Sequence, residues 1–156
     1  MAKKKTKIDI RFLIIILSLI VTLLIIAPAL GYNDAPYSGL QVTFGTTITD
    51  ASILGSVVLK FNIFVLLSYL LPIIAVVSLL FFKKKYSILI AFGALVLSAI
   101  LLFIMPSYVD LYVTLLGKET AKSVDWVLQW GLVISGVISS LAALLSLYQA
   151  YLIYKK

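Results

Sequence analysis

Phe81-Phe82-Lys83-Lys84-Lys85-Tyr86-Ser87 places three consecutive lysines between two long apolar runs. A hydrocarbon core about 30 Å thick is crossed by roughly 20 apolar residues. Short lysine-rich loops between spans remain on the cytoplasmic side of the membrane. The sequence therefore predicts that residues 83–87 form a cytoplasmic turn, in which Lys83, Lys84 and Lys85 set the orientation of the chain.

The composition indicates a polytopic membrane protein. The chain has 156 residues, of which 63% are hydrophobic, whereas ordinary soluble domains have about 45–50% apolar residues. We predict one integral membrane domain over residues 1–156, an all-α bundle of four transmembrane helices with a small extracellular cap. The spans are expected at about 9–30, 61–82, 88–105 and 126–154, and the outside segments at about 31–60 and 106–125.

The basic residues gather on one side of this topology. Most of the 13 lysines and arginines flank the expected cytoplasmic ends of the spans: Lys3, Lys4, Lys5, Lys7, Arg11, Lys83, Lys84, Lys85, Lys155 and Lys156. This asymmetry follows the positive-inside rule and places both termini in the cytoplasm. We expect these side chains to contact anionic lipid headgroups of the bilayer, and we do not expect nucleic acid as a partner.

The first apolar run has two interpretations. A basic leader, an apolar core and the small residues Ala27 and Ala29 are also the features of a cleavable signal peptide. The competing interpretation is a retained first span, because residues 9–30 are long and apolar enough to cross the membrane. We favour the retained span and expect Pro28 and Gly31 to end its helix.

The first outside segment is expected to contain a short strand. Leu40, Val42 and Phe44 alternate with the polar residues Gln41 and Thr43, and this period of two is typical of a half-buried strand. A lone strand is unstable in water, so we expect a partner in residues 46–49 or in the second outside segment. An irregular cap over the bundle is the alternative.

Three aromatic residues of the first outside segment are candidates for a surface that binds a partner. They are Tyr32, Tyr37 and Phe44. Aromatic side chains are enriched where proteins bind one another. The alternative role for all three is to fill the interior of the cap.

Two helix starts are predicted from capping residues. Asp50 can cap a helix that begins at Ala51 and leads into the second span. Ser123 or Asp125 can cap the fourth span, which is expected to begin with Trp126 at a membrane interface.

The fourth span carries small residues at every fourth position: Gly131, Ser135, Ser139 and Ala143. Such a row lets another helix approach closely. We predict that it packs inside the bundle rather than forming a specialised dimer face. Pro72, in the middle of the second span, is expected to kink that helix and thereby to help packing or to shape a cavity.

The residue types that are missing exclude several chemistries. The sequence contains no cysteine and no histidine, which excludes disulfides, thiol chemistry and histidine-based triads. Without these ligands, a conventional zinc, haem or iron–sulfur site is not expected. The interior of the predicted spans has no charged residue, which argues against proton relays. We therefore predict no catalytic residue, no cofactor and no metal site.

The predicted layout resembles that of the claudin-type tetraspan proteins. Both have a larger outside segment with strand character, a short basic turn and a smaller second outside segment. The claudin signature of tryptophan and paired cysteines is missing, and residues 37–45, Tyr-Ser-Gly-Leu-Gln-Val-Thr-Phe-Gly, stand in its place. The resemblance therefore implies a topology and no junction function. The frequent lysine and isoleucine are similar to those of small four-span proteins of bacterial plasma membranes.

The leading functional hypothesis is a non-enzymatic protein of the plasma membrane. It would act as a structural or accessory subunit through its cap and helix faces, with a protein partner or as a homo-oligomer. The alternative is an oligomeric channel or carrier for a neutral or lipid-like solute. An enzyme that acts on lipid would depend on Asp, Glu, Lys or Tyr alone for acid–base chemistry, and is the least favoured hypothesis.

Overall fold

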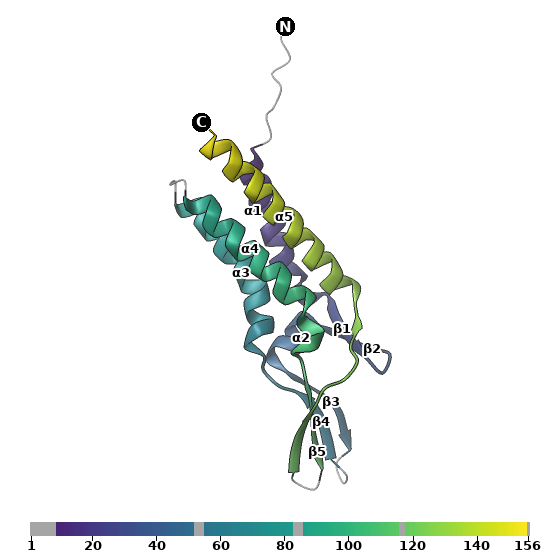
Figure 1. Ribbon diagram of the computed structural model, residues 1–156. Coiled ribbons are helices and arrows are strands. Elements are labelled where there is room, and N and C mark those ends of the chain that lie inside the picture. Colours follow the sequence, from purple (N-terminus) through teal and green to yellow (C-terminus); the bar gives the residue numbers. More distant parts are fainter. Residues whose placement is uncertain (1–8, 52–54, 83–85, 116–117, 156) are drawn as a thin grey trace.

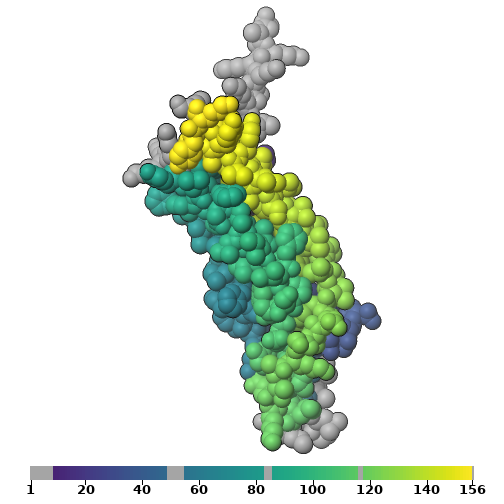
Figure 2. Space-filling model, viewed as in Figure 1, coloured from purple at the N-terminus to yellow at the C-terminus, as the bar shows by residue number. Residues whose placement is uncertain are grey.

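The computed structural model describes residues 9–51, 55–82, 86–115 and 118–155 (Figure 1). The helical segments that run side by side in a bundle are α1 (Ile10–Leu23) with its 3₁₀ continuation η1 (Leu24–Ile26), α3 (Ile63–Phe81), α4 (Tyr86–Phe103) and α5 (Trp130–Tyr154). Two small sheets lie at one end of the elongated molecule (Figure 1), and the molecule tapers towards this end (Figure 2). We call it the sheet end, and the opposite end, where the described chain begins and finishes, the terminal end.

The bundle is the part of the fold that could cross a membrane. α3, α4 and α5, with 19, 18 and 25 residues, are long and apolar enough to do so, and Ile10–Ile26 is a shorter apolar helix. α3 and α4 lie at the spans predicted at 61–82 and 88–105. The bundle is helical, as predicted, and the cap region, where a short strand was expected, contains two small β-sheets.

A three-stranded sheet contains residues that were predicted to belong to the ends of the first and fourth spans. Its order is β2-β1-β7, with β1 at Pro28–Tyr32, β2 at Ala35–Ser38 and β7 at Val127–Leu128. The first helix ends early because Pro28 cannot continue it and Ala27 is already extended. The first span predicted at 9–30 is therefore too long.

The fourth helix begins later than predicted. Because β7 pairs with β1, Trp126 and the two residues after it lie outside α5. The N-cap of α5 is Gln129, and not Ser123 or Asp125 as predicted. The amide of Gln129 donates to Ala29 O, with N and O 3.1 Å apart, which ties the start of α5 to β1.

The predicted strand over residues 40–44 is wrong, because this segment is the helix α2 (Gly39–Phe44). Ser38 and Gln41 form a capping box, in which each side chain binds the backbone amide of the other, and this motif starts a helix. The buried positions, Gly39, Val42 and Thr43, have helical spacing. In a helix of only six residues, apolar side chains can also occur at every second position, so this pattern did not distinguish a helix from a strand.

A four-stranded antiparallel sheet stands beyond α2, with the order β3-β4-β5-β6. Its strands are β3 (Thr46–Ala51), β4 (Gly55–Leu59), β5 (Leu111–Leu115) and β6 (Lys118–Lys122). β4 and β5 pair with Val57 opposite Val113. This sheet therefore joins two segments that are far apart in the sequence, and both suggested partner regions, residues 46–49 and the second outside segment, contain strands.

The predicted helix from Ala51, capped by Asp50, is also wrong. Residues 46–51 and 55–59 are rich in Thr and Val, whose branched side chains favour strands, and they pair as β3 and β4. Residues 52–54 of the predicted helix lie outside the described residues. The cap of the following helix is Asn62, whose side-chain oxygen accepts from the amides of Phe64 and Val65 at 3.0 and 3.3 Å. The helix α3 consequently begins at Ile63, two residues after the predicted start of the second span.

The apolar core runs from the bundle into both sheets. At the sheet end, Leu30, Tyr37, Val42, Leu111 and Trp126 belong to one buried cluster that also includes bundle residues. The cluster towards the terminal end is made largely of small and aliphatic side chains: Ile14, Ala75, Leu79, Ile88, Ala91, Ala94, Leu95, Ala142, Ala143 and Ala150. The sheets are therefore packed onto the helices rather than attached by linkers.

Serine hydroxyls connect the helices through backbone carbonyls. Pro72 in α3 has no N–H, so the carbonyl of Ser68, four residues earlier, lacks its usual helical donor. The Ser98 hydroxyl of α4 donates to this carbonyl, with the oxygens 2.7 Å apart. Thr22 of α1 donates to the next carbonyl, Tyr69 O, at 3.3 Å. Side chains of neighbouring helices therefore donate hydrogen bonds to the backbone carbonyls near Pro72.

Ser98→Ala should destabilise the bundle more in the native chain than in a Pro72→Ala background. In the native chain it removes the donor to Ser68 O, whereas the alanine that replaces Pro72 supplies a helical N–H to the same oxygen. We expect a coupling free energy of roughly 0.5–2 kcal/mol. Unfolding of the four proteins of this double-mutant cycle in mixed micelles would measure it. Equal effects of Ser98→Ala in both backgrounds would contradict the assignment.

Candidate functional site

The predicted row of small residues on α5 lies inside the bundle. Gly131, Ser135, Ser139 and Ala143 are all buried. The Ser139 hydroxyl donates to Leu95 O of α4 at 3.0 Å. A Cβ added at Gly131 would lie only 2.7 Å from the Cβ of Ala27, so glycine is needed where α5 crosses the start of β1.

The terminal end is held by an arginine. The Arg11 guanidinium of α1 donates to Phe82 O at 2.9 Å and to the Ser87 hydroxyl at 3.2 Å. The Ser78 hydroxyl donates to Ser87 O at 2.7 Å, which joins α3 and α4 directly. The predicted topology residues Lys83, Lys84 and Lys85 lie outside the described residues. Arg11 and Lys155 place positive charge at this end.

The aromatic candidates separate into an interior group and an exposed one. Tyr37 is buried and Tyr32 half-buried, and their ring centroids lie 6.4 and 5.8 Å from that of Trp126. The Trp126 indole N–H donates to Val109 O at 2.7 Å. Tyr37 is therefore a core residue and not part of an accessible surface. Phe44 is exposed and contacts Phe61, with ring centroids 6.3 Å apart.

The four-stranded sheet carries an ion pair on one face. Lys60 binds Glu119 of β6, and the Lys60 ammonium also lies 4.5 Å from the centroid of the Tyr112 ring. Tyr112 lies opposite Val58 in the ladder. All of β6 is exposed. The sheet therefore presents charged, aromatic and hydroxyl groups to water beyond the end of the bundle.

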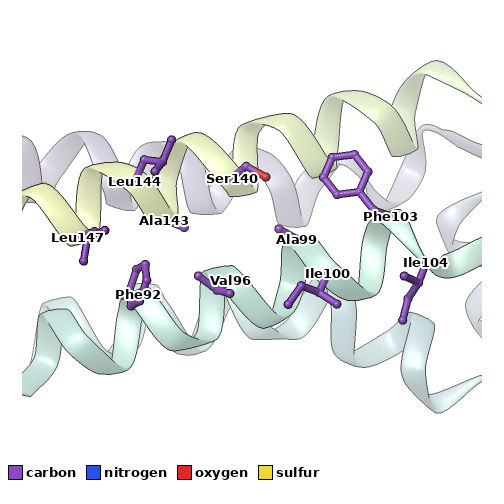
Figure 3. A pocket seen from close by; sticks show the side chains of 10 residues that line it. All are labelled: Phe92, Val96, Ala99, Ile100, Phe103, Ile104, Ser140, Ala143, Leu144 and Leu147. Carbon is purple, nitrogen blue, oxygen red and sulfur yellow. The ribbon is translucent and has the colours of Figure 1, made fainter.

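An apolar groove of about 580 Å³ lies between α4 and α5 (Figure 3). Ser140 contributes the polar side chain of its lining, and its hydroxyl already donates to Gly136 O at 2.9 Å. A Cβ at Gly136 would lie 2.8 Å from the Phe103 ring, so this glycine lets Phe103 close one part of the groove. The lining residues are Phe92, Val96, Ala99, Ile100, Phe103, Ile104, Ser140, Ala143, Leu144 and Leu147.

A smaller polar hollow of about 380 Å³ lies where the two sheets meet. It is lined by Tyr32, Lys122, Ser123, Val124 and Asp125. Lys122, Ser123 and Asp125 are exposed. Charged side chains of this kind are well hydrated at a surface, so the hollow alone does not define a ligand.

The described residues offer little acid–base chemistry. Among them, no group of three or more His, Cys, Asp or Glu side chains is placed to hold a metal ion. Tyr108, next to the sheet end of α4, donates its hydroxyl proton to Leu101 O at 2.9 Å. Burial raises the pKa of this hydroxyl above its ordinary value, so it remains a hydrogen-bond donor rather than a base.

Comparisons with known protein families, with curated proteins and with solved structures found no match. The function is therefore inferred from the geometry of this chain alone.

Two structural roles were missed from the sequence. Trp126 was assigned to a membrane interface, whereas in the structure it is buried in the sheet-end core. Arg11 was counted only as a topology charge, although it joins three helices. The signal for the Ser98 bond was present, because a proline in a span leaves a carbonyl free, but the sequence does not show which hydroxyl reaches it.

Trp126→Phe should loosen the sheet end, whereas Trp130→Phe should not. Trp126 is 8% exposed and donates to Val109 O, while Trp130 is 55% exposed. Loss of the buried donor should lower the local stability by about 1–3 kcal/mol. Hydrogen exchange of the Gln129 amide, which binds Ala29 O, would report this change. Equal protection in both variants would contradict the role assigned to Trp126.

Proposed function

We propose that the chain is a non-enzymatic membrane protein with four spans, which acts as a structural or accessory subunit of the plasma membrane. Ile10–Ile26 is the first span in this proposal. Its 14 α-helical residues and three 3₁₀ residues rise about 27 Å, close to the hydrocarbon thickness of about 30 Å. It packs against α3 and α5, which also supports a retained segment over a cleaved signal peptide.

The proposed orientation places the terminal end in the cytoplasm. Arg11 and Lys155 lie at that end, and the positive-inside rule favours it. At the sheet end, by contrast, the positive charge of Lys60 is balanced by its ion pair with Glu119. This topology resembles that of the claudin-type tetraspans, but the signature motif is missing, so no claudin function is proposed.

The observation that supports an interaction role is the four-stranded sheet. It projects beyond the bundle (Figure 1) and is packed onto the helices through the core around Leu59 and Leu111. A sheet held in this way can bind a protein partner without losing conformational freedom, which favours affinity. The bundle interior, by contrast, is filled by alanine and by serines that bind backbone carbonyls.

Thr120→Cys should react with a membrane-impermeant maleimide carrying benzophenone, added to intact cells, and should then photo-cross-link to a single partner. Thr120 is exposed on β6, and the chain has no native cysteine. Lys155→Cys is the control and should react only after permeabilisation. Failure of Thr120→Cys to react would overturn the orientation. Reaction without a discrete adduct, detected by mass spectrometry, would overturn the interaction role.

The groove between α4 and α5 favours a second candidate function, the binding of a lipid-like solute. Its lining is apolar on both helices, and Ile100 and Leu144 at its margin are exposed. Along α4 it extends from Phe92 towards Ile104, about 18 Å of helix, which exceeds half of the hydrocarbon thickness. One acyl chain could therefore lie along it.

Ser140→Phe should fill this groove and reduce the lipid that stays bound to the purified protein. The matched control is Ile74→Phe, on the exposed face of α3, where the added ring should not change lipid retention. Native mass spectrometry of both variants and the parent protein would count the bound lipids. Unchanged lipid retention in Ser140→Phe would remove this second function.

A further inference from the structure

Four exposed apolar side chains form a patch where α2 meets the start of α3. They are Leu40, Phe44, Phe61 and Phe64, and their exposed fractions lie between 38% and 61%. The rings of Phe44 and Phe61 are in contact. We call this patch the interfacial foot. Exposed apolar patches of this kind mark surfaces that bind a partner or a membrane.

Two hydrogen bonds fix the position of α2 relative to the bundle. The Gly39 amide donates to Ala27 O, just after η1, at 3.2 Å, and the Asn62 amide, just before α3, donates to Thr43 O at 2.9 Å. A helix of six residues is about 9 Å long, and packed helices are about 8–10 Å apart. α2 therefore bridges the sheet-end termini of the first helical segment and α3.

The backbone of α2 lies directly on the bundle. A Cβ added at Gly39 would lie 2.8 Å from Ile25 O and 3.0 Å from the Tyr69 hydroxyl. α2 buries Gly39, Val42 and Thr43 and leaves Leu40 and Phe44 exposed. The foot is therefore held at the level where the helices end, and not in the sheets beyond.

The foot is continuous with the apolar face of a predicted membrane span. Ile63, Leu67 and Leu70 of α3 are exposed beside Phe64, and α3 is apolar and long enough to cross a membrane. On the other side of Phe61, Lys60 binds Glu119. The change from apolar to charged exposed side chains thus occurs between residues 61 and 60.

The side-chain oxygens of Gln41 and Thr43 in α2 form local hydrogen bonds. The Gln41 carbonyl oxygen accepts from the Ser38 amide at 2.9 Å. The Thr43 hydroxyl donates to Gly39 O at 2.7 Å. Satisfied polar groups lower the cost of placing α2 at the boundary between headgroups and acyl chains.

We propose that the interfacial foot inserts into the bilayer leaflet on the sheet side, and that lipid is its partner. α2 then lies in the membrane interface, with Leu40 and Phe44 among the acyl chains. The two sheets project from this level into water. This placement is independent of which side of the membrane the sheets occupy and of the proposed interaction role.

Nitroxide labels on single cysteines would test this placement in phosphatidylethanolamine–phosphatidylglycerol vesicles. For each label, the measured quantity is the ratio of its collision rate with oxygen to its collision rate with a water-soluble nickel chelate. This ratio should be several-fold higher for labels at Leu40→Cys and Phe44→Cys than for a label at Thr120→Cys on β6. Leu67→Cys, on the exposed face of α3, is the reference for the hydrocarbon core. EPR power saturation measures both collision rates.

Foot labels that behave like Thr120→Cys would overturn the proposal, because the foot would then lie in water. Low collision rates with both reagents would also overturn it, because another protein chain would then cover the foot. The native protein provides a test without substitution. Diazirine-bearing phospholipid should modify residues 40–44 and 61–64, and modification confined to residues 65–81 would contradict insertion.

Discussion

A backbone carbonyl in a membrane-spanning helix needs a donor from within the protein, since the hydrocarbon core offers no water. Pro72 removes one such donor in α3, and Ser98 of α4 replaces it at Ser68 O. The replacement requires close contact between the two helices. The small and hydroxyl-bearing residues of α4 and α5 meet the same requirement along the bundle, as Ser139 does at Leu95 O. The same side chains therefore allow the helices to pack closely and supply hydrogen bonds to backbone carbonyls.

The bundle and the sheet end are coupled mechanically. Gly131 at the start of α5 lies against Ala27 and Pro28, and Trp126 packs with residues of both sheets and the bundle in one cluster. A force or a ligand that displaces the sheets would consequently act on α5 and on the first helix. This continuity favours a protein that binds a partner with a preformed surface over one whose cap moves as a lid.

The helices α3 and α4 could be predicted from the sequence because one property, the length of each apolar run, largely determines them. They follow from the length of two apolar runs and from the three lysines that separate these runs in the sequence. The sheet end did not follow, because its pairings involve distant segments, such as Val57 with Val113. α2 was mistaken for a strand, although the sequence spacing of Ser38 and Gln41 matches a capping box. The interfacial foot could not be predicted from the sequence. Phe44 and Phe61 are far apart in the chain, and the hydrogen bond from the Asn62 amide to Thr43 O brings their segments together.

The pairing of β4 with β5 and of β1 with β7 sets an order of assembly. β1 emerges right after the first helix, but its partner β7 comes much later in the chain, directly before α5. Contacts between such distant segments form late because closing long loops costs chain entropy. During synthesis, helices can form one by one, whereas neither sheet can be completed until the second segment at the sheet end has been made. Both sheets can therefore be completed only after α3 and α4 have been made, and α5, which directly follows β7, is the last helix to join the bundle.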